Sequence, residues 1–118
     1  MKKIYHLSTC STCRNLLTAI HADKKGYALQ NIKTEKITPA QLDEMAEMAG
    51  GYEPLFSRRS TKYKEMGLKD KPLTEKDYRS LILQEYTFLK RPVITNGKKI
   101  FIGSEKKTVE ALKKAHGV

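Results

Sequence analysis

Hydrophobic and polar positions along the chain repeat with two periods, and each period predicts a different kind of element. Short segments rich in β-branched and aromatic residues are typical of strands. The segments of this kind are residues 3–7, 27–32, 91–95 and 99–102. Asn96-Gly97, between the last two segments, is the strongest short-range signal for a β-hairpin, so we expect these two strands to pair.

Apolar residues at helical spacing predict a helix directly after the first strand. The apolar stripe of this helix consists of Leu16, Leu17, Ala19 and Ile20. Gly26 is a natural residue to end it, so we expect the helix to run from about residue 11 to residue 25. With the strand that follows, it forms a β-α-β unit, whose crossover is right-handed if the two strands are parallel neighbours.

A second helix has a clear start and a clear end in the sequence. Thr38 is placed to cap its N-terminus, Pro39 to occupy its first position and Gln41 to complete a capping box. Its apolar stripe consists of Leu42, Met45, Ala46 and Ala49. Gly50-Gly51 then ends the helix, because glycine readily adopts the left-handed backbone of a helix C-terminus.

Three further helices are expected in the remainder of the chain. A short one ends near Gly67, and the next begins with a box-like pair, Thr74 and Asp77, and continues to about Tyr86. The last helix follows the hairpin, and we expect Ser104 to cap its N-terminus.

This order of elements predicts the fold class. A β-α-β unit, a set of helices, a β-hairpin and a closing helix form an α/β chain of the thioredoxin-like type with a helical insertion. We expect one domain over residues 1–118, with the insertion at about 38–88. In this arrangement the residue before the hairpin faces the turn after the first strand, so Pro92 is a candidate cis-proline beside Cys10.

The chain's two cysteines, Cys10 and Cys13, lie in that turn. Cys10 is expected at the helix N-terminus, where unpaired backbone N–H groups and the helix dipole favour a thiolate. Arg14, about one helical turn away, adds a positive charge that lowers the thiol pKa further. Cys13 is then positioned to attack a mixed disulfide formed at Cys10. Hydroxyl residues surround the pair and favour a partly exposed turn; they are Ser8, Thr9, Ser11 and Thr12.

Other uses of the two cysteines fit the sequence less well. Two cysteines do not complete a zinc site, and His6, His21 and His116 show no metal-ligand spacing around them, so we expect no metal. A permanent disulfide would close a very short loop and would constrain little. Buried, inert cysteines remain an alternative. The strand-turn-helix context favours a redox-active pair.

Composition adds a charge asymmetry to this picture. The net charge is +10; residues 1–56 carry 7 basic against 6 acidic side chains, and residues 57–118 carry 16 against 7. The excess is consistent with an anionic partner, namely an oxyanion, glutathione, an acidic protein face or nucleic acid. Most of the lysines are read as a solvated surface, and they form no nucleic-acid motif, so we expect no direct DNA binding.

The sequence contains no apolar run long enough to span a bilayer, and Met1-Lys2-Lys3 leads into a strand rather than into a signal peptide. We therefore expect no membrane association and a cytoplasmic location. In that compartment a Cys-x-x-Cys pair cycles between its oxidised and reduced states.

Four motifs, in this order and spacing, resemble those of the glutaredoxin-like arsenate reductase (ArsC)/Spx family. They are Cys10-Ser11-Thr12-Cys13-Arg14, Ser57-Arg58-Arg59-Ser60, Arg91-Pro92-Val93-Ile94 and Ile102-Gly103. The resemblance extends over essentially the whole chain and implies a thioredoxin-like fold with a helical insertion. By position, it implies that Cys10 is the nucleophile of the arsenate reductases and that Arg59 and Arg91 are two of their three oxyanion-binding arginines. Guanidinium groups suit this role because they bind tetrahedral oxyanions through paired contacts.

The chain departs from the arsenate reductases at two positions. Ser104 occupies the place of their third arginine, and Cys13 supplies an internal resolving thiol that those enzymes usually lack. The resemblance implies no bound cofactor and an external reductant, either glutathione with glutaredoxin or thioredoxin. The leading expectation is a thiol–disulfide oxidoreductase with Cys10 as nucleophile, Cys13 as resolving thiol and arsenate as a candidate substrate.

The alternative expectation is a redox-sensing regulator similar to Spx. Spx binds the C-terminal domain of the RNA polymerase α subunit, and its Cys-x-x-Cys disulfide is the switch. Gly51 falls where Spx has a glycine at that interface, although Gly50-Gly51 is equally explained as a helix end. An enzyme turns over a substrate, whereas a regulator binds a large protein and need not do so.

Overall fold

The computed structural model describes residues 2–7, 9–97 and 99–117. The chain divides into two compact units, one formed by residues 1–35 together with 91–118 and the other by residues 36–90. The second unit has nearly the same bounds as the helical insertion expected at about 38–88. That the two units form a single domain stays a prediction.

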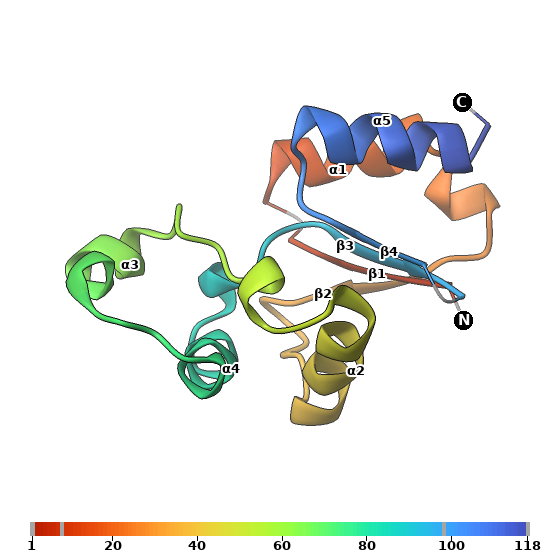
Figure 1. Ribbon diagram of the computed structural model, residues 1–118. Helices are drawn as coiled ribbons and strands as arrows, with labels where there is room; N and C mark the ends of the chain where they lie inside the picture. Colours follow the sequence, from red (N-terminus) through yellow and green to blue (C-terminus); the bar gives the residue numbers. More distant parts are fainter. Residues whose placement is uncertain (1, 8, 98, 118) are drawn as a thin grey trace. The chain divides into compact units, whose positions relative to one another are not determined.

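The first unit is built on a mixed four-stranded sheet with the strand order β2-β1-β3-β4 (Figure 1). The strands are β1 (Lys2–His6), β2 (Ala28–Asn31), β3 (Val93–Asn96) and β4 (Lys99–Ile102). β1 and β2 are parallel neighbours, and β3 is antiparallel to both β1 and β4. The expected hairpin is confirmed, because Asn96 pairs with Lys99 and Gly97 has a φ of 63°. Lys98, in the same turn, lies outside the described residues.

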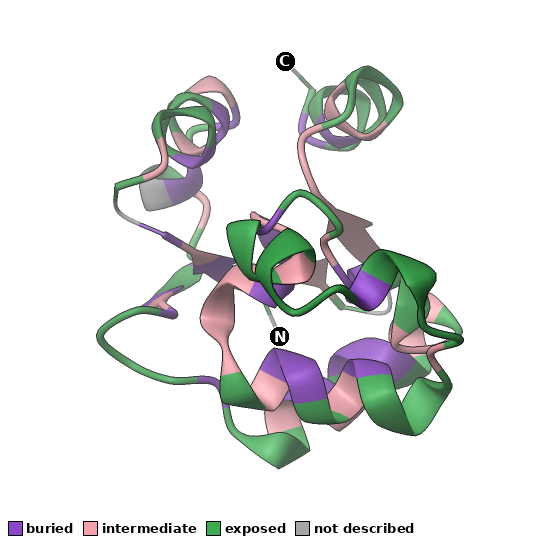
Figure 2. Cartoon of the chain, turned by 90° about the vertical axis from the view of Figure 1, so that its left-hand side faces the viewer, coloured by how far each residue is buried: buried purple, intermediate pink, exposed green. Residues whose placement is uncertain are grey.

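Two helices, α1 (Ser11–Ala19) and α5 (Lys106–Ala115), lie on the same face of this sheet (Figure 1). Each helix buries one side and exposes the other (Figure 2). The core between helices and sheet is apolar, and its buried members are Ile4, Leu16, Ile20, Ala22, Tyr27, Ile94 and Leu112. Three of the four residues of the predicted stripe, Leu16, Leu17 and Ile20, therefore pack in one core with Ile4 of the first strand.

The first helix is shorter than predicted, which corrects its expected end near residue 25. It ends at Ala19, His21 has a left-handed backbone with a φ of 54°, and a short 3₁₀ helix, η1 (Ala22–Lys24), follows. Ile20 and Ala22 are both buried in the core. A continued α-helix would rotate Ala22 by roughly 200° away from Ile20, so only a break allows both side chains to reach the same core.

The burial pattern of β2 differs from what the hydropathy of its residues would suggest. In β2 the polar residue is inside: Gln30 is 1% exposed and Leu29 is 51% exposed. The buried amide of Gln30 donates a hydrogen bond to the carbonyl of Glu35 at 3.0 Å.

The predicted cap of the last helix is wrong, because the N-cap of α5 is Glu105 rather than Ser104. The N–H of Gly103 still bonds to the Pro92 carbonyl at 2.9 Å, so strand pairing extends beyond β4 and the helix begins later.

The second unit is helical, and the predicted starts of two of its helices, at Thr38 and Thr74, are confirmed. Its α-helices are α2 (Pro39–Ala49), α3 (Thr61–Glu65) and α4 (Glu75–Gln84). Its 3₁₀ helices are η2 (Glu53–Leu55), η3 (Leu68–Asp70) and η4 (Tyr86–Phe88). Capping boxes form at Thr38 with Gln41 and at Thr74 with Asp77, whereas Tyr86 lies outside α4, which ends at Gln84.

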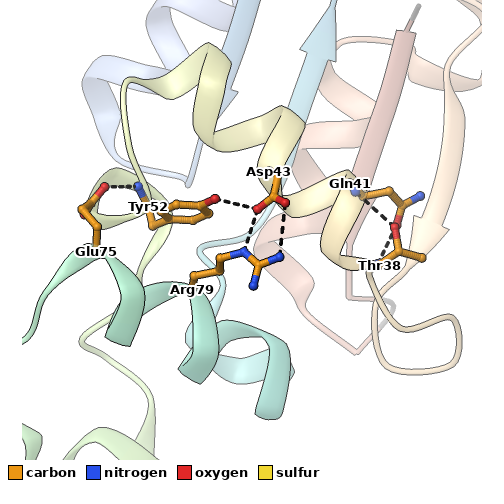
Figure 3. Close-up of polar contacts among 6 residues, drawn as sticks. All are labelled: Thr38, Gln41, Asp43, Tyr52, Glu75 and Arg79. Atoms are coloured by element: carbon orange, nitrogen blue, oxygen red, sulfur yellow. Dashed lines mark hydrogen bonds and ion pairs between the residues drawn. The ribbon is translucent and has the colours of Figure 1, made fainter.

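A polar cluster joins α2 to α4 within this unit (Figure 3). Arg79 donates to both carboxylate oxygens of Asp43, at 2.8 and 3.2 Å, and the Tyr52 hydroxyl donates to the same group. The hydrogen bonds from Arg79 and then from Tyr52 lower the pKa of Asp43 to about 2. Glu75, the first residue of α4, accepts hydrogen bonds from the backbone N–H groups of Tyr52 and Glu53. These bonds fix the turn that follows α2.

None of the helices that the structure describes is both long enough and apolar enough to cross a membrane.

Candidate active site

Cys10 lies between the sheet and the first helix. It is the N-cap residue of α1, with φ −88° and ψ 109°, and its side chain is partly exposed. Its backbone N–H donates to the Leu7 carbonyl at 3.0 Å, and its carbonyl accepts from the Arg14 N–H at 3.2 Å. The turn thus starts from the end of β1 and leads directly into the helix. Ser8, one of the hydroxyl residues expected in this turn, lies outside the described residues.

The surroundings of Cys10 lower its pKa. Partial burial of the thiol acts in the opposite direction, but hydrogen bonds from the Cys13 backbone and the Cys13 thiol outweigh it, helped by the charge of Arg91 and the Thr12 N–H. Backbone N–H groups at a helix start stabilise an anion without needing a charged side chain. Cys10 is therefore the cysteine of the pair that ionises first.

Cys13 has the opposite character. It is 0% exposed, and both cysteines are free thiols. Burial, together with the hydrogen bond that its thiol donates to Cys10, raises the pKa of Cys13 to about 12, although a hydrogen bond from the Leu7 backbone works in the other direction. The two cysteines thus differ in both access and acidity, as a nucleophile and a protected second thiol would.

Arg91 and Pro92 immediately precede β3. Tyr5 pairs with Val93 in the antiparallel ladder, so continuing the register sets Pro92 opposite His6 and Arg91 opposite Leu7. The Arg91–Pro92 peptide bond is cis, as expected for this position, and Pro92 is buried. Arg91 is partly buried, and its charge acts on both Cys10 and Cys13.

Arg14 is exposed on the first turn of α1, and the cation that lowers the pKa of Cys10 is Arg91. A supporting role for Arg14 stays a prediction. Ser104, at the position of the arsenate reductases' third arginine, is partly buried between Gly103 and the cap of α5.

Arg59 belongs to the second unit, in the segment before α3. The N–H of Ser57 donates to the Phe88 carbonyl at 2.6 Å, which anchors this segment. The two adjacent arginines, Arg58 and Arg59, are both exposed. Arg58 donates to the Tyr78 hydroxyl at 3.1 Å and lies over the Phe56 and Tyr78 rings. Binding of an oxyanion by Arg59 stays a prediction.

One residue of the strand that leads to the cysteine turn, His6, was considered from the sequence only as a metal ligand. His6 ends β1, and its Nδ1 atom is buried without a hydrogen-bond partner among the described residues. Strand alternation could have flagged it, because His6 is two residues after the core residue Ile4. Within the described part of the chain, no group of three or more His, Cys, Asp and Glu side chains is arranged to hold a metal ion.

Comparison with known proteins identifies the family. The sequence profile of the ArsC family matches residues 5–112. The chain belongs to the ArsC family. Among curated relatives of this ArsC-family chain is the global transcriptional regulator Spx 1 of Lactococcus lactis subsp. lactis, which is 25% identical over 112 residues, covering 94% of this chain and 88% of Spx 1.

Solved structures share the fold of this ArsC-family chain at low sequence identity. An arsenate reductase from Vibrio cholerae superimposes with a TM-score of 0.78 at 16% identity, covering 96% of this chain and 95% of that protein. The YffB (PA3664) protein gives a TM-score of 0.79 at 20% identity, covering 95% of this chain and 98% of that one. The predicted α/β, thioredoxin-like fold is confirmed.

Proposed function

We propose that this ArsC-family chain is a thiol–disulfide oxidoreductase that uses Cys10 as its nucleophile and Cys13 as its resolving thiol. The observation that carries the proposal is the contrast between the two thiols. Cys10 is partly exposed with a lowered pKa, and Cys13 is fully buried with a pKa of about 12. A thiolate that is accessible to a substrate, next to a buried thiol that hydrogen-bonds to Cys10, suits a two-step exchange.

In the first step the Cys10 thiolate attacks the oxidised substrate and forms a covalent adduct. Arg91, whose charge already acts on Cys10, would hold the anionic group of the substrate. The family resemblance adds Arg59 to this role, and its exposed guanidinium, unlike that of Arg58, is not engaged by Tyr78. Pro92 would shape the floor of the site, and Arg14 would support ionisation of Cys10.

In the second step Cys13 attacks the Cys10 sulfur. The bond between Cys10 and the adduct breaks, its electron pair leaves with the reduced product, and a Cys10–Cys13 disulfide remains. With arsenate, those two electrons reduce As(V) to As(III). An external thiol then reduces the protein disulfide, and glutathione with glutaredoxin, or thioredoxin, is the proposed reductant. No bound cofactor is required, and the reducing environment of the cytoplasm would sustain the cycle.

A coupled turnover assay tests the proposal. NADPH consumption is followed with arsenate and either glutathione, glutaredoxin and glutathione reductase, or thioredoxin and its reductase. We expect turnover that is lost in Cys10→Ser, and we expect Cys13→Ser to accumulate mixed disulfides. Absence of Cys10-dependent turnover with arsenate and also with a disulfide substrate would overturn the proposal. Turnover with the disulfide alone would exclude arsenate and would indicate that Ser104 does not replace the third arginine.

The second candidate function is a redox-sensing regulator similar to Spx. The likeness to Spx 1 over 94% of this chain favours it. It would bind the RNA polymerase α subunit through the turn at Gly51 and would not contact DNA directly. A pull-down with the C-terminal domain of that subunit, using the oxidised and the reduced protein, tests it. Binding that depends on the disulfide, in a protein without turnover, would favour the regulator over the enzyme.

A further inference from the structure

A buried imidazole nitrogen lies at the end of β1, the strand that leads into the cysteine turn. The Nδ1 atom of His6 is buried and has no hydrogen-bond partner among the described residues. Such atoms are uncommon in folded proteins because burial without a partner costs free energy. Burial also lowers the pKa of His6, which keeps its imidazole neutral at neutral pH. A neutral imidazole offers one nitrogen lone pair that can accept a proton.

Strand alternation places the His6 side chain on the face of the sheet that α1 covers. His6 is two residues after Ile4, and Ile4 packs in one core with Leu16 and Ile20 of α1. The chain reverses between β1 and α1, so the start of the helix lies over the end of the strand (Figure 1).

Cys13 lies at this same end of the sheet. It is fully buried, one helical turn before Leu16, and its sulfur accepts a hydrogen bond from the N–H of Leu7, the residue that follows His6. His6 and Cys13 thus share one face and one end of the sheet.

The resolving step needs a proton acceptor at this place. In the reduced protein the Cys13 thiol donates its hydrogen bond to Cys10. Once Cys10 is part of a mixed disulfide, its sulfur carries no negative charge and is a poor acceptor. The Cys13 thiol, with a pKa of about 12, must nevertheless lose its proton to become a nucleophile.

We propose that His6 is the general base that takes the Cys13 proton when Cys13 attacks the mixed disulfide. The proposal rests on the resolving role of Cys13 in the proposed function. The proton moves to Nδ1 of His6, the Cys13 sulfur bonds to the Cys10 sulfur, and the bond from Cys10 to the substrate sulfur breaks. The substrate leaves as a thiolate with that electron pair, and the His6 imidazolium returns its proton to the leaving thiolate or to solvent. Proton count and charge are conserved.

The charged and titratable groups that the fold brings to this end of the sheet come from three segments. They are Cys10 and Cys13 from the α1 turn, Arg91 from the segment before β3, and Glu105, Lys106 and Lys107 at the exposed start of α5. Only burial shifts the pKa of His6. The pH dependence of the resolving step should therefore report His6 itself.

A single-turnover reaction with the aromatic disulfide dithiobis(nitrobenzoate) separates the two steps. Attack by Cys10 releases one equivalent of coloured thionitrobenzoate, and attack by Cys13 on the mixed disulfide releases the second. His6→Asn keeps a polar atom near the Nδ1 position but removes the base. His21→Asn is the matched control, because His21 is exposed and has the left-handed backbone that asparagine tolerates.

We expect the second release in His6→Asn to be slowed by about 100-fold at pH 7, the usual scale for a positioned base, with the first release unchanged. The wild-type rate of the second release should fall as His6 protonates and level off above that pH. In His6→Asn it should instead rise about tenfold per pH unit, because only prior ionisation of Cys13 then supplies the nucleophile.

Three results would overturn the proposal. An unchanged second release in His6→Asn would show that His6 takes no proton, while the resolving pair itself would stand. Equal slowing of both releases would show that the substitution acts through the structure of the turn. A wild-type protein that releases only one equivalent would show that Cys13 does not resolve, and both this inference and the proposed function would fail.

Discussion

Substitution of Gly51 tests whether the fold itself requires a glycine at this position or whether the glycine serves only to bind a partner protein. Its φ is 147°, and an added Cβ would lie 2.6 Å from Oε1 of Glu75. That carboxylate accepts the N–H groups of Tyr52 at 2.7 Å and Glu53 at 3.2 Å. In Gly51→Ala, Glu75 must therefore move away and give up hydrogen bonds that fix the turn after α2.

The expected cost can be worked out from these contacts. A non-glycine residue at this φ is strained by about 2 kcal/mol. The two partly solvated hydrogen bonds add about 0.5 kcal/mol each, so the total is about 3 kcal/mol. The matched control is Gly50→Ala: Gly50 also has a positive φ, 84°, but an added Cβ meets nothing within 4 Å. Its cost should be about 1 kcal/mol, the usual penalty of a left-handed alanine.

Thermal unfolding followed by circular dichroism measures both changes. We expect a melting temperature lower by about 12 °C for Gly51→Ala and by about 4 °C for Gly50→Ala. In a Glu75→Ala background the hydrogen bonds are already absent, so Gly51→Ala should cost about 1 kcal/mol less than in the wild type. Equal losses for the two glycines, or no coupling to Glu75, would refute this account of Gly51.

Three other predictions follow from the fold and the site. Arg91→Met should raise the pKa of Cys10 and slow its alkylation at pH 7 several-fold, whereas Arg58→Met, at an arginine engaged elsewhere, should leave that rate unchanged. Burial lowers the pKa of His6, so the unfolded state binds more protons and the free energy of unfolding should fall as pH drops from about 6.5 toward 5. Urea midpoints of the wild type and of His6→Asn, measured across this pH range, test this. The same pH dependence in both proteins would contradict it. If the chain is one domain, hydrogen exchange in residues 1–35 and 36–90 should collapse at the same urea concentration, and two separate midpoints would contradict the single-domain prediction.

Features that depend on neighbouring residues could be predicted from the sequence. The boxes at Thr38 and Thr74 and the Asn96-Gly97 turn require only side chains within a few positions, and all of them form as expected. The cysteine turn was also predicted from its local context, a strand before and an apolar stripe after it. Local chemistry therefore defined most element boundaries and the location of the candidate site.

Features set by distant residues could not be predicted in the same way. The first helix ends at Ala19 because Ala22 must reach a core built with Ile94 and Leu112. The burial of Gln30 depends on the carbonyl of Glu35. The charge acting on Cys10 comes from Arg91, which is brought there by the antiparallel pairing of β1 with β3, whereas the sequence pointed to the nearby Arg14.

The most direct test of the central claim is the pH dependence of alkylation at each cysteine. The reduced protein is treated with iodoacetamide across pH 4 to 10, and the modified residue is identified by peptide mass spectrometry, with Cys13→Ser and Cys10→Ser as single-thiol references. We expect Cys10 to react alone, with a midpoint below the value of about 8.5 for a free cysteine, and Cys13 to stay protected throughout. An ordinary midpoint at Cys10, or equal reactivity of the two thiols, would contradict it.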